Sequence, residues 1–152
     1  MRENMGLYRG KRNDNGEWVF GALYKKTHFY GDPCAEWYII TSTESLVYDQ
    51  ALEYHEVDPE TVGQFTGLTD KNGKKIFEGD IIRVLGDQAS MDWKNVDYIG
   101  SVAFIDTGFC IIDGTIEEHG FRRYGMHRMD FTLEVIGNIH DNPELLREEV
   151  EK

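Results

Sequence analysis

Short apolar runs separated by turn-forming residues recur along the chain. These runs are rich in β-branched and aromatic residues, or they alternate apolar with polar positions, and both patterns are typical of β-strands. We expect strands at residues 17–24, 37–41, 52–57, 81–85, 96–105, 109–112 and 131–139. The pattern therefore predicts a mainly β fold.

Three turn motifs join neighbouring runs. Asn15-Gly16 and Asn72-Gly73 supply residue types that readily adopt the positive φ angles of a tight hairpin turn. Asp106-Thr107-Gly108 is a third short turn between two apolar runs. We expect a β-hairpin at each of these motifs.

The predicted strand at residues 17–24 is apolar on both faces. Side chains alternate between the two faces of a strand, so every second residue shares a face. One face carries Trp18, Phe20, Ala22 and Tyr24, and the other carries Val19 and Leu23. We expect both faces to contact protein, as they would in a barrel or a covered sheet.

Two short helical elements are predicted from capping signals. Asp58 is an N-cap residue type followed by Pro59, which suits a single helical turn between strands. Near the end of the chain, Asn142 can cap a helix that begins at Pro143. We therefore expect a short C-terminal helix within a helical tail at residues 141–152.

Residues 113–130 show little periodicity and contain three Gly, two His and three Arg. We expect an exposed connection there, where binding groups often lie. If aromatic and basic side chains share one face, they would stack on unpaired bases or anchor a protein partner. The alternative is that the aromatic rings fill a barrel interior. The candidate binding residues are Tyr98, Phe121, Arg122, Arg123, Tyr124 and Arg128.

Composition and charge limit the class of protein. The chain has 152 residues, of which 40% are hydrophobic and 12% aromatic, so it can bury a core. A net charge of -12 disfavours generic binding to a phosphate backbone. Three basic clusters could still form a local patch, at residues 9–12, 71–75 and 122–128. The alternative is that these charges are scattered over the surface and solvated.

Cysteine usage and hydropathy bear on the compartment. Cys34 and Cys110 are far apart and lack the spacing of a zinc site or a disulfide framework. Residues 1–6 lack the apolar core of a signal peptide, and no apolar stretch approaches the length of a membrane span. We expect a protein of the reducing cytoplasm.

No set of residues combines nucleophile, base and electrophilic partner at a recognisable spacing. Glu78 and Asp80, with Asp70 nearby, could bind a metal or act in acid–base chemistry. The alternative, which we favour, is a bulge or tight turn at Gly79 in which Asp80 accepts backbone N–H bonds. Cys34 could act as a nucleophile only if a His folded against it. We expect no enzyme activity, no metal and no cofactor.

Several motifs carry a family resemblance. They are RGK at residues 9–11, GEWVFG at 16–21, DPETVGQFTGL at 58–68, DKNG at 70–73, IFEGDI at 76–81 and EVIGNIHDNPELL at 134–146. In this order and spacing the chain resembles the YopX family of phage and prophage proteins. The residues of these motifs to which we assign structural roles are Gly67, Asp70, Asn72, Gly73, Glu78, Gly79, Asp80, Asn142 and Pro143.

The resemblance implies a β-barrel-containing fold and a phage or prophage origin, and it transfers no catalytic residues. We expect one domain over residues 1–152 with an SH3-like barrel core. Two lobes, 1–62 and 63–140, followed by the tail, are the alternative. The expected function is a non-enzymatic accessory module in the cytoplasm of a bacterial host. It would work through a protein partner of phage or host, or through self-association. Nucleic-acid binding and acidic mimicry of DNA are the alternatives.

Overall fold

The computed structural model describes residues 6–41, 53–86, 97–106, 108–117, 120–125 and 131–147. For residues 113–117 and 120–125 it describes the backbone. Over these ranges the protein is mainly β, with two antiparallel sheets. The chain divides into two compact units, Met1–Phe65 and Thr66–Lys152. Our two-lobe alternative placed the division after residue 62, and the number of folding domains stays a prediction.

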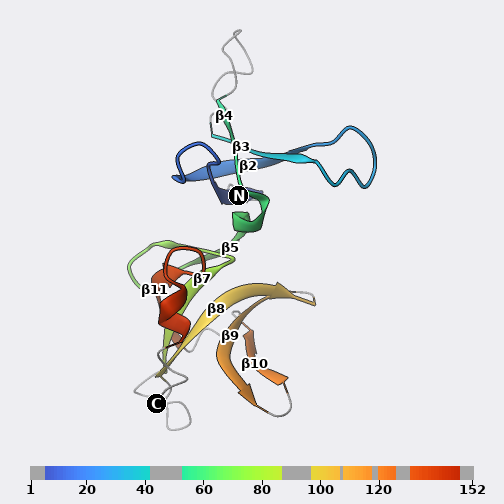
Figure 1. Cartoon of the computed structure of the whole chain (residues 1–152). Helices are drawn as coiled ribbons and strands as arrows, with labels where there is room; N and C mark the ends of the chain where they lie inside the picture. Colours follow the sequence, from blue (N-terminus) through green and yellow to red (C-terminus); the bar gives the residue numbers. More distant parts are fainter. Residues whose placement is uncertain are drawn as a thin grey trace. The chain divides into compact units, whose positions relative to one another are not determined.

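Within the described residues, four antiparallel strands lie in the first unit, and Figure 1 shows their course. In sheet order they are β4 (Tyr54–Glu56), β3 (Glu36–Ile40), β2 (Trp18–Lys26) and β1 (Leu7–Lys11). On its other side, β1 pairs with the start of β5 (Gly63–Thr69). The predicted strands at 17–24 and 37–41 are confirmed by β2 and β3, and the one at 52–57 is confirmed over Tyr54–Glu56, with residue 52 outside the described residues. The Asn15-Gly16 hairpin is confirmed too, with a φ of +72° at Gly16.

Close backbone packing shapes the first unit. Ile39 and Val57 are buried, and a Cβ atom at Gly10 would lie 3.0 Å from the side chain of Val57. The predicted helical turn is a 3-10 helix, η1 (Pro59–Thr61), and the Asp58 carboxylate accepts a hydrogen bond from the backbone N–H of Glu60 at 3.0 Å. The capping prediction is therefore confirmed.

Within the described residues, the second unit holds a five-stranded antiparallel sheet and the β5–β6 hairpin, of which β5 begins in the first unit. The sheet order is β10 (Gly120–Gly125), β9 (Gly108–Glu117), β8 (Asp97–Ile105), β7 (Asp80–Gly86) and β11 (Phe131–Asn138). β6 (Lys75–Phe77) neighbours β5 across the Asn72-Gly73 turn. The pairings among the residues seen here give an open order, so the closed SH3-like barrel is not confirmed.

One apolar cluster forms the core of the second unit. Its buried members are Ile76, Ile82, Val84, Val102 and Ile111. Four of them come from the paired strands β7, β8 and β9, and Ile76 comes from β6 of the β5–β6 hairpin. The pairing of β7, β8 and β9 and the burial of their apolar side chains therefore support each other.

The expectation of an irregular connection at residues 113–130 is wrong for residues 113–117 and 120–125, which form strands, while residues 118–119 and 126–130 lie outside the described residues and the exposure stays a prediction. β9 continues to Glu117, and β10 pairs with it as a further hairpin. The register shifts between Phe121 and Arg123. Residues 113–115 of β9 lie between the paired positions where β10 has only Arg122, so the pairing is irregular there. The sequence of these strands does not alternate apolar with polar residues, so the period-2 pattern does not reveal them.

The predicted C-terminal helix is a 3-10 helix, η2 (Pro143–Leu146), and residues 148–152 lie outside the described chain. The predicted cap by Asn142 is wrong. Its side chain makes no capping bond and instead accepts a hydrogen bond from the backbone N–H of Asn138 at 3.3 Å. None of the helices in the described ranges has the length and apolar character that a membrane span requires.

Candidate functional site

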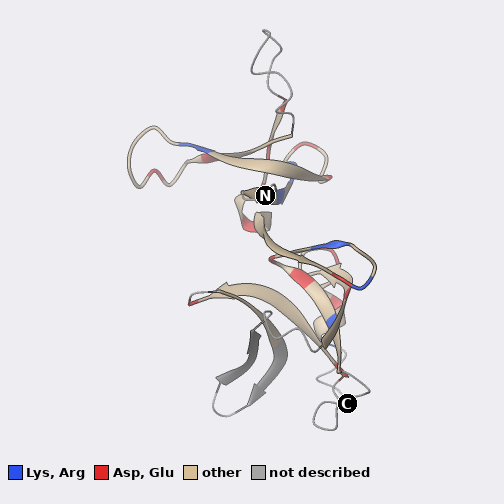
Figure 2. Cartoon of the chain, turned by 180° about the vertical axis from the view of Figure 1, so that it is seen from behind, with Lys and Arg blue, Asp and Glu red and all other residues tan. Residues whose placement is uncertain are grey.

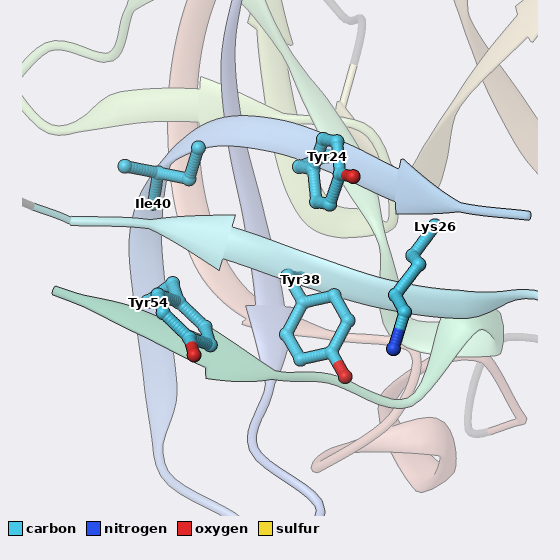
Figure 3. A pocket seen from close by; sticks show the side chains of 5 residues that line it. All are labelled: Tyr24, Lys26, Tyr38, Ile40 and Tyr54. Atoms are coloured by element: carbon cyan, nitrogen blue, oxygen red, sulfur yellow. The ribbon is translucent and has the colours of Figure 1, made fainter. Parts of the chain in front are cut away.

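A row of tyrosine side chains crosses three neighbouring strands of the first unit (Figure 3). Tyr24 on β2 lies opposite Tyr38 on β3, and Ile40 on β3 lies opposite Tyr54 on β4. Directly opposed residues point to the same face of a sheet. We call this surface, formed by Tyr24, Lys26, Tyr38, Ile40 and Tyr54, the tyrosine face.

The tyrosine rings contact one another and surround a pocket of about 430 Å³. The ring centroids of Tyr24 and Tyr38 are 6.3 Å apart with an interplanar angle of 36°. Those of Tyr38 and Tyr54 are 5.6 Å apart, and the rings meet edge to face at 81°. Both distances lie in the range that stabilises aromatic pairs, so each ring restrains its neighbour.

The two faces of this sheet differ in exposure. Ile39, on the opposite face of β3, is fully buried. On the face that carries the tyrosines, Phe20 is 48% exposed, Tyr24 is 52% exposed and Tyr54 is 61% exposed. Our expectation that both faces of this strand contact protein is therefore wrong for the Phe20 and Tyr24 side, which is open to solvent.

A charged pair at the side of the pocket orients Tyr38. The Tyr38 hydroxyl donates a hydrogen bond of 2.6 Å to Oε2 of Glu36, and Lys26 Nζ donates to the same oxygen at 3.1 Å. These two bonds lower the pKa of Glu36. The bond to Glu36, followed by desolvation, raises the pKa of Tyr38 to about 12. At neutral pH the pair therefore holds the Tyr38 ring in one orientation.

Asp70, one of the predicted structural residues, is 7% exposed and accepts backbone N–H bonds from two separate segments. Oδ1 accepts from Asn72 at 2.8 Å and Lys74 at 2.9 Å, and Oδ2 accepts from Val135 at 3.1 Å. Burial raises the pKa of Asp70, but these bonds outweigh it, and the net pKa is lowered. Asp70 thus closes the β5–β6 turn and joins it to β11.

Asp80 in the Glu78-Gly79-Asp80 motif is 2% exposed, and its Oδ2 accepts the Phe77 backbone N–H at 2.8 Å. This is the backbone-accepting role that we favoured over metal binding. Within the described ranges, no group of three or more His, Cys, Asp or Glu side chains could hold a metal ion.

The glycines of the predicted motifs take conformations that other residues rarely adopt. Gly67, Gly73 and Gly79 have φ angles of +87°, +79° and +85°. Gly79 also connects two strands, because its N–H donates to Val102 and its carbonyl accepts from Ile139. These three glycines allow the backbone to turn where other residues would be strained.

The candidate binding residues of the second unit do not form a site that the structure describes. Tyr98 is half-buried and packs against the apolar core. The strand that carries Phe121, Arg122, Arg123 and Tyr124 is described by its backbone, and Arg128 lies outside the described residues. The packing of Tyr98 agrees with the alternative that aromatic rings fill the interior.

Basic residues are interspersed with acidic ones along the described elements (Figure 2). Arg9 is only 6% exposed, and its guanidinium lies 4.7 Å from the ring centroid of Trp18. Arg12 pairs with Asp14, and Lys71 pairs with Glu134 at 2.9 Å. Local pairing therefore reduces the charge that two of the three predicted basic clusters could offer to a phosphate backbone.

The two cysteines occupy different surroundings. Cys110 is buried in β9, and Cys34 is exposed in the loop between β2 and β3. The backbone N–H of Cys34 donates to Oδ1 of Asp32 at 2.9 Å, while Oδ2 of Asp32 accepts from the backbone N–H of His28 at 3.0 Å. This carboxylate fixes the loop backbone and leaves the Cys34 thiol without an assigned role.

Sequence reasoning did not identify the tyrosine face. The alternation of Phe20, Ala22 and Tyr24 predicts an apolar face on this strand, but it does not indicate that the face is open. The missing information was the register of β2, β3 and β4, which brings Tyr38 and Tyr54 beside Tyr24.

The fold and the site define a mainly β protein with two antiparallel sheets and an exposed aromatic sheet face. The chain belongs to the YopX family, because the family model described as YopX protein matches residues 7–147. Among solved structures, the chain is similar to protein EF1440 from Enterococcus faecalis. The two share 26% sequence identity with a TM-score of 0.51, over 92% of this chain and 96% of that chain. No curated protein matched this chain.

Proposed function

We propose that this protein functions through contacts with a protein partner and that the tyrosine face is its binding surface. The observation that carries the proposal is that the half-buried Tyr38 contacts the exposed rings of Tyr24 and Tyr54 around one pocket. Tyrosine is enriched among the residues that contribute most to protein interfaces, because it buries a large ring at a low cost in conformational entropy.

The arrangement of the tyrosine face supports this proposal. Tyr38 is held by Glu36 and by both neighbouring rings, so a partner would meet a preformed surface. The net charge of -12 favours a protein partner over a nucleic acid, even though tyrosine rings can stack on bases. Membership of the YopX family supports a phage or prophage accessory role in a bacterial cytoplasm, which is part of the proposal.

For the Thr66–Lys152 unit, we propose a supporting role built on an SH3-like barrel. The five-stranded antiparallel sheet, and the apolar core to which its strands β7, β8 and β9 contribute buried residues, support that architecture. The proposal assigns no reaction to either unit.

The test is an affinity capture from bacterial lysate with matched variants. The unmodified protein and Phe104→Ala should recover the same partner, while Tyr54→Ala and Tyr38→Ala should lose it. Phe104 is a suitable control because it is 51% exposed and lies on β8 of the other unit. Equal recovery by all four proteins would assign the contact to another surface, and a reproducible turnover without a partner would refute the non-enzymatic role.

A further inference from the structure

We infer that the tyrosine face binds a proline-rich segment of its partner in the polyproline II conformation, with a basic residue of that segment beside Glu36 and Glu56. This inference rests on the proposed function and specifies the chemistry of the partner. It follows from where the pocket lies in the sheet, from the spacing of its rings and from the charges around it.

The pocket lies on the face of the sheet, where only side chains are presented. The backbones of β2, β3 and β4 are already paired with one another in antiparallel register. A ligand in β conformation would find no backbone partners on this face, because strands pair along their edges. A polyproline II segment has no internal backbone bonds and keeps its backbone hydrated, so it can lie on an aromatic surface without losing hydrogen bonds.

The spacing of the rings matches that conformation. Neighbouring ring centroids along the tyrosine face are 6.3 Å and 5.6 Å apart. Polyproline II has three residues per turn and rises about 3.1 Å per residue, so residues two positions apart advance by about 6 Å and lie on neighbouring edges of its three-sided cross-section. With two of these three edges turned toward the sheet, prolines two positions apart would contact successive rings. An α-helix is about 10–12 Å wide and would need anchors over several turns, which this short row of rings does not provide.

The charges around the pocket favour a basic residue in the ligand. Glu36 borders Tyr38, and its charge is balanced in part by Lys26 at 3.1 Å. Glu56 is exposed and lies directly opposite Tyr38 in the β3–β4 register, so it shares the same face. These carboxylates outnumber Lys26, and an arginine or lysine beside the prolines would complement them.

The experiment uses the full chain and a displayed library of random linear peptides as the probe. We expect enriched peptides to contain prolines two positions apart and a flanking Arg or Lys. For the best binder, fluorescence anisotropy should show that Tyr54→Ala weakens affinity at least about tenfold, the scale of an interface hot spot. Glu56→Gln should weaken it about threefold and reduce its dependence on salt. Phe104→Ala should leave it unchanged.

Tyr54 is the informative position, since its side chain is 61% exposed and its truncation should preserve the fold. Circular dichroism of each variant checks this. Enrichment of proline-free peptides, no enrichment at all, or unchanged affinity in Tyr54→Ala would overturn the inference. If the captured partner still depends on Tyr54 while the library yields no proline-rich ligand, the inference fails and the proposed function stands. If neither partner nor peptide depends on Tyr54, the proposed function fails as well.

Discussion

The carboxylate of Asp70 connects parts of the chain that are far apart in sequence. It accepts backbone N–H bonds within its own turn and one from Val135 on β11. Since the side chain is almost fully buried, removing its charge leaves donors that water cannot easily reach. The residue therefore contributes to stability through contacts that its local sequence shows only in part.

We predict that Asp70→Asn lowers the free energy of unfolding by about 1–3 kcal/mol at neutral pH. The folded-state pKa of Asp70 lies below its ordinary value of 3.8, so its contribution is present above that pH and is lost as the pH falls through the lower folded value. Urea denaturation at a series of pH values measures this. Asp97→Asn, which breaks an exposed pair with Arg83, is the control and should cost less. Equal costs would contradict the prediction.

The bond between Tyr38 and Glu36 has its own pH signature. Its effect on the pKa of Tyr38, about 12 against an ordinary value of 10.0, should disappear in Glu36→Gln, whose neutral side chain no longer favours the protonated phenol. Because the folded pKa is raised, the stabilisation is complete below pH 10 and is lost as the pH rises through about 12. The absorbance of tyrosinate, followed against Tyr38→Phe, isolates this group. An unchanged titration in Glu36→Gln would show that burial alone shifts it.

At the scale of elements, Gly21 determines how closely β2 and β3 can pack. A Cβ atom there would lie 1.9 Å from the carbonyl oxygen of Ile40. We predict that Gly21→Ala costs about 2–3 kcal/mol of stability and disturbs the tyrosine face, because the two strands must separate. Thermal unfolding and tyrosine fluorescence measure both effects.

Gly108→Ala is the matched control for that substitution. A Cβ atom at Gly108 meets no atom within 4 Å, and its φ is not in the left-handed region. We expect a change within about 0.5 kcal/mol. A Gly21→Ala protein as stable as Gly108→Ala would mean that β2 and β3 adjust their spacing without cost.

Predictions of elements succeeded where the signal was local. The Asn15-Gly16 turn and the Asp58 cap were predicted because the residues that form them are neighbours in sequence. The β9–β10 hairpin was missed because residues 113–117 and 120–125 do not alternate apolar with polar residues, so their pairing has no local signal. The capping role predicted for Asn142 was wrong because its side-chain oxygen accepts a hydrogen bond from the backbone N–H of Asn138, which the capping pattern does not reveal.

At the scale of the whole molecule, the two compact units suggest that each has its own stability. Ile82 is fully buried in the core of the second unit. We predict that Ile82→Ala destabilises this unit by about 2–5 kcal/mol and speeds amide hydrogen exchange in β7, β8 and β11. Exchange in β2 and β3 of the first unit should change little.

Hydrogen exchange followed by mass spectrometry resolves the two units. If Ile82→Ala accelerates amide exchange equally in β2, β3 and β7, the chain unfolds as one cooperative domain, which is the single-domain prediction. Confinement of the effect to the second unit would support the two-lobe alternative.

By itself, the amino-acid sequence determined that this protein is mainly β, where most of its strands and turns lie, and that it carries the motifs of its family. These properties depend on side-chain alternation and turn chemistry, which act over a few residues. Only the tertiary structure decided that Tyr24, Tyr38 and Tyr54 share an open face and that Asp70 reaches β11. Such contacts depend on strand register and on the burial of one face over another, and both are set by the packing of distant segments.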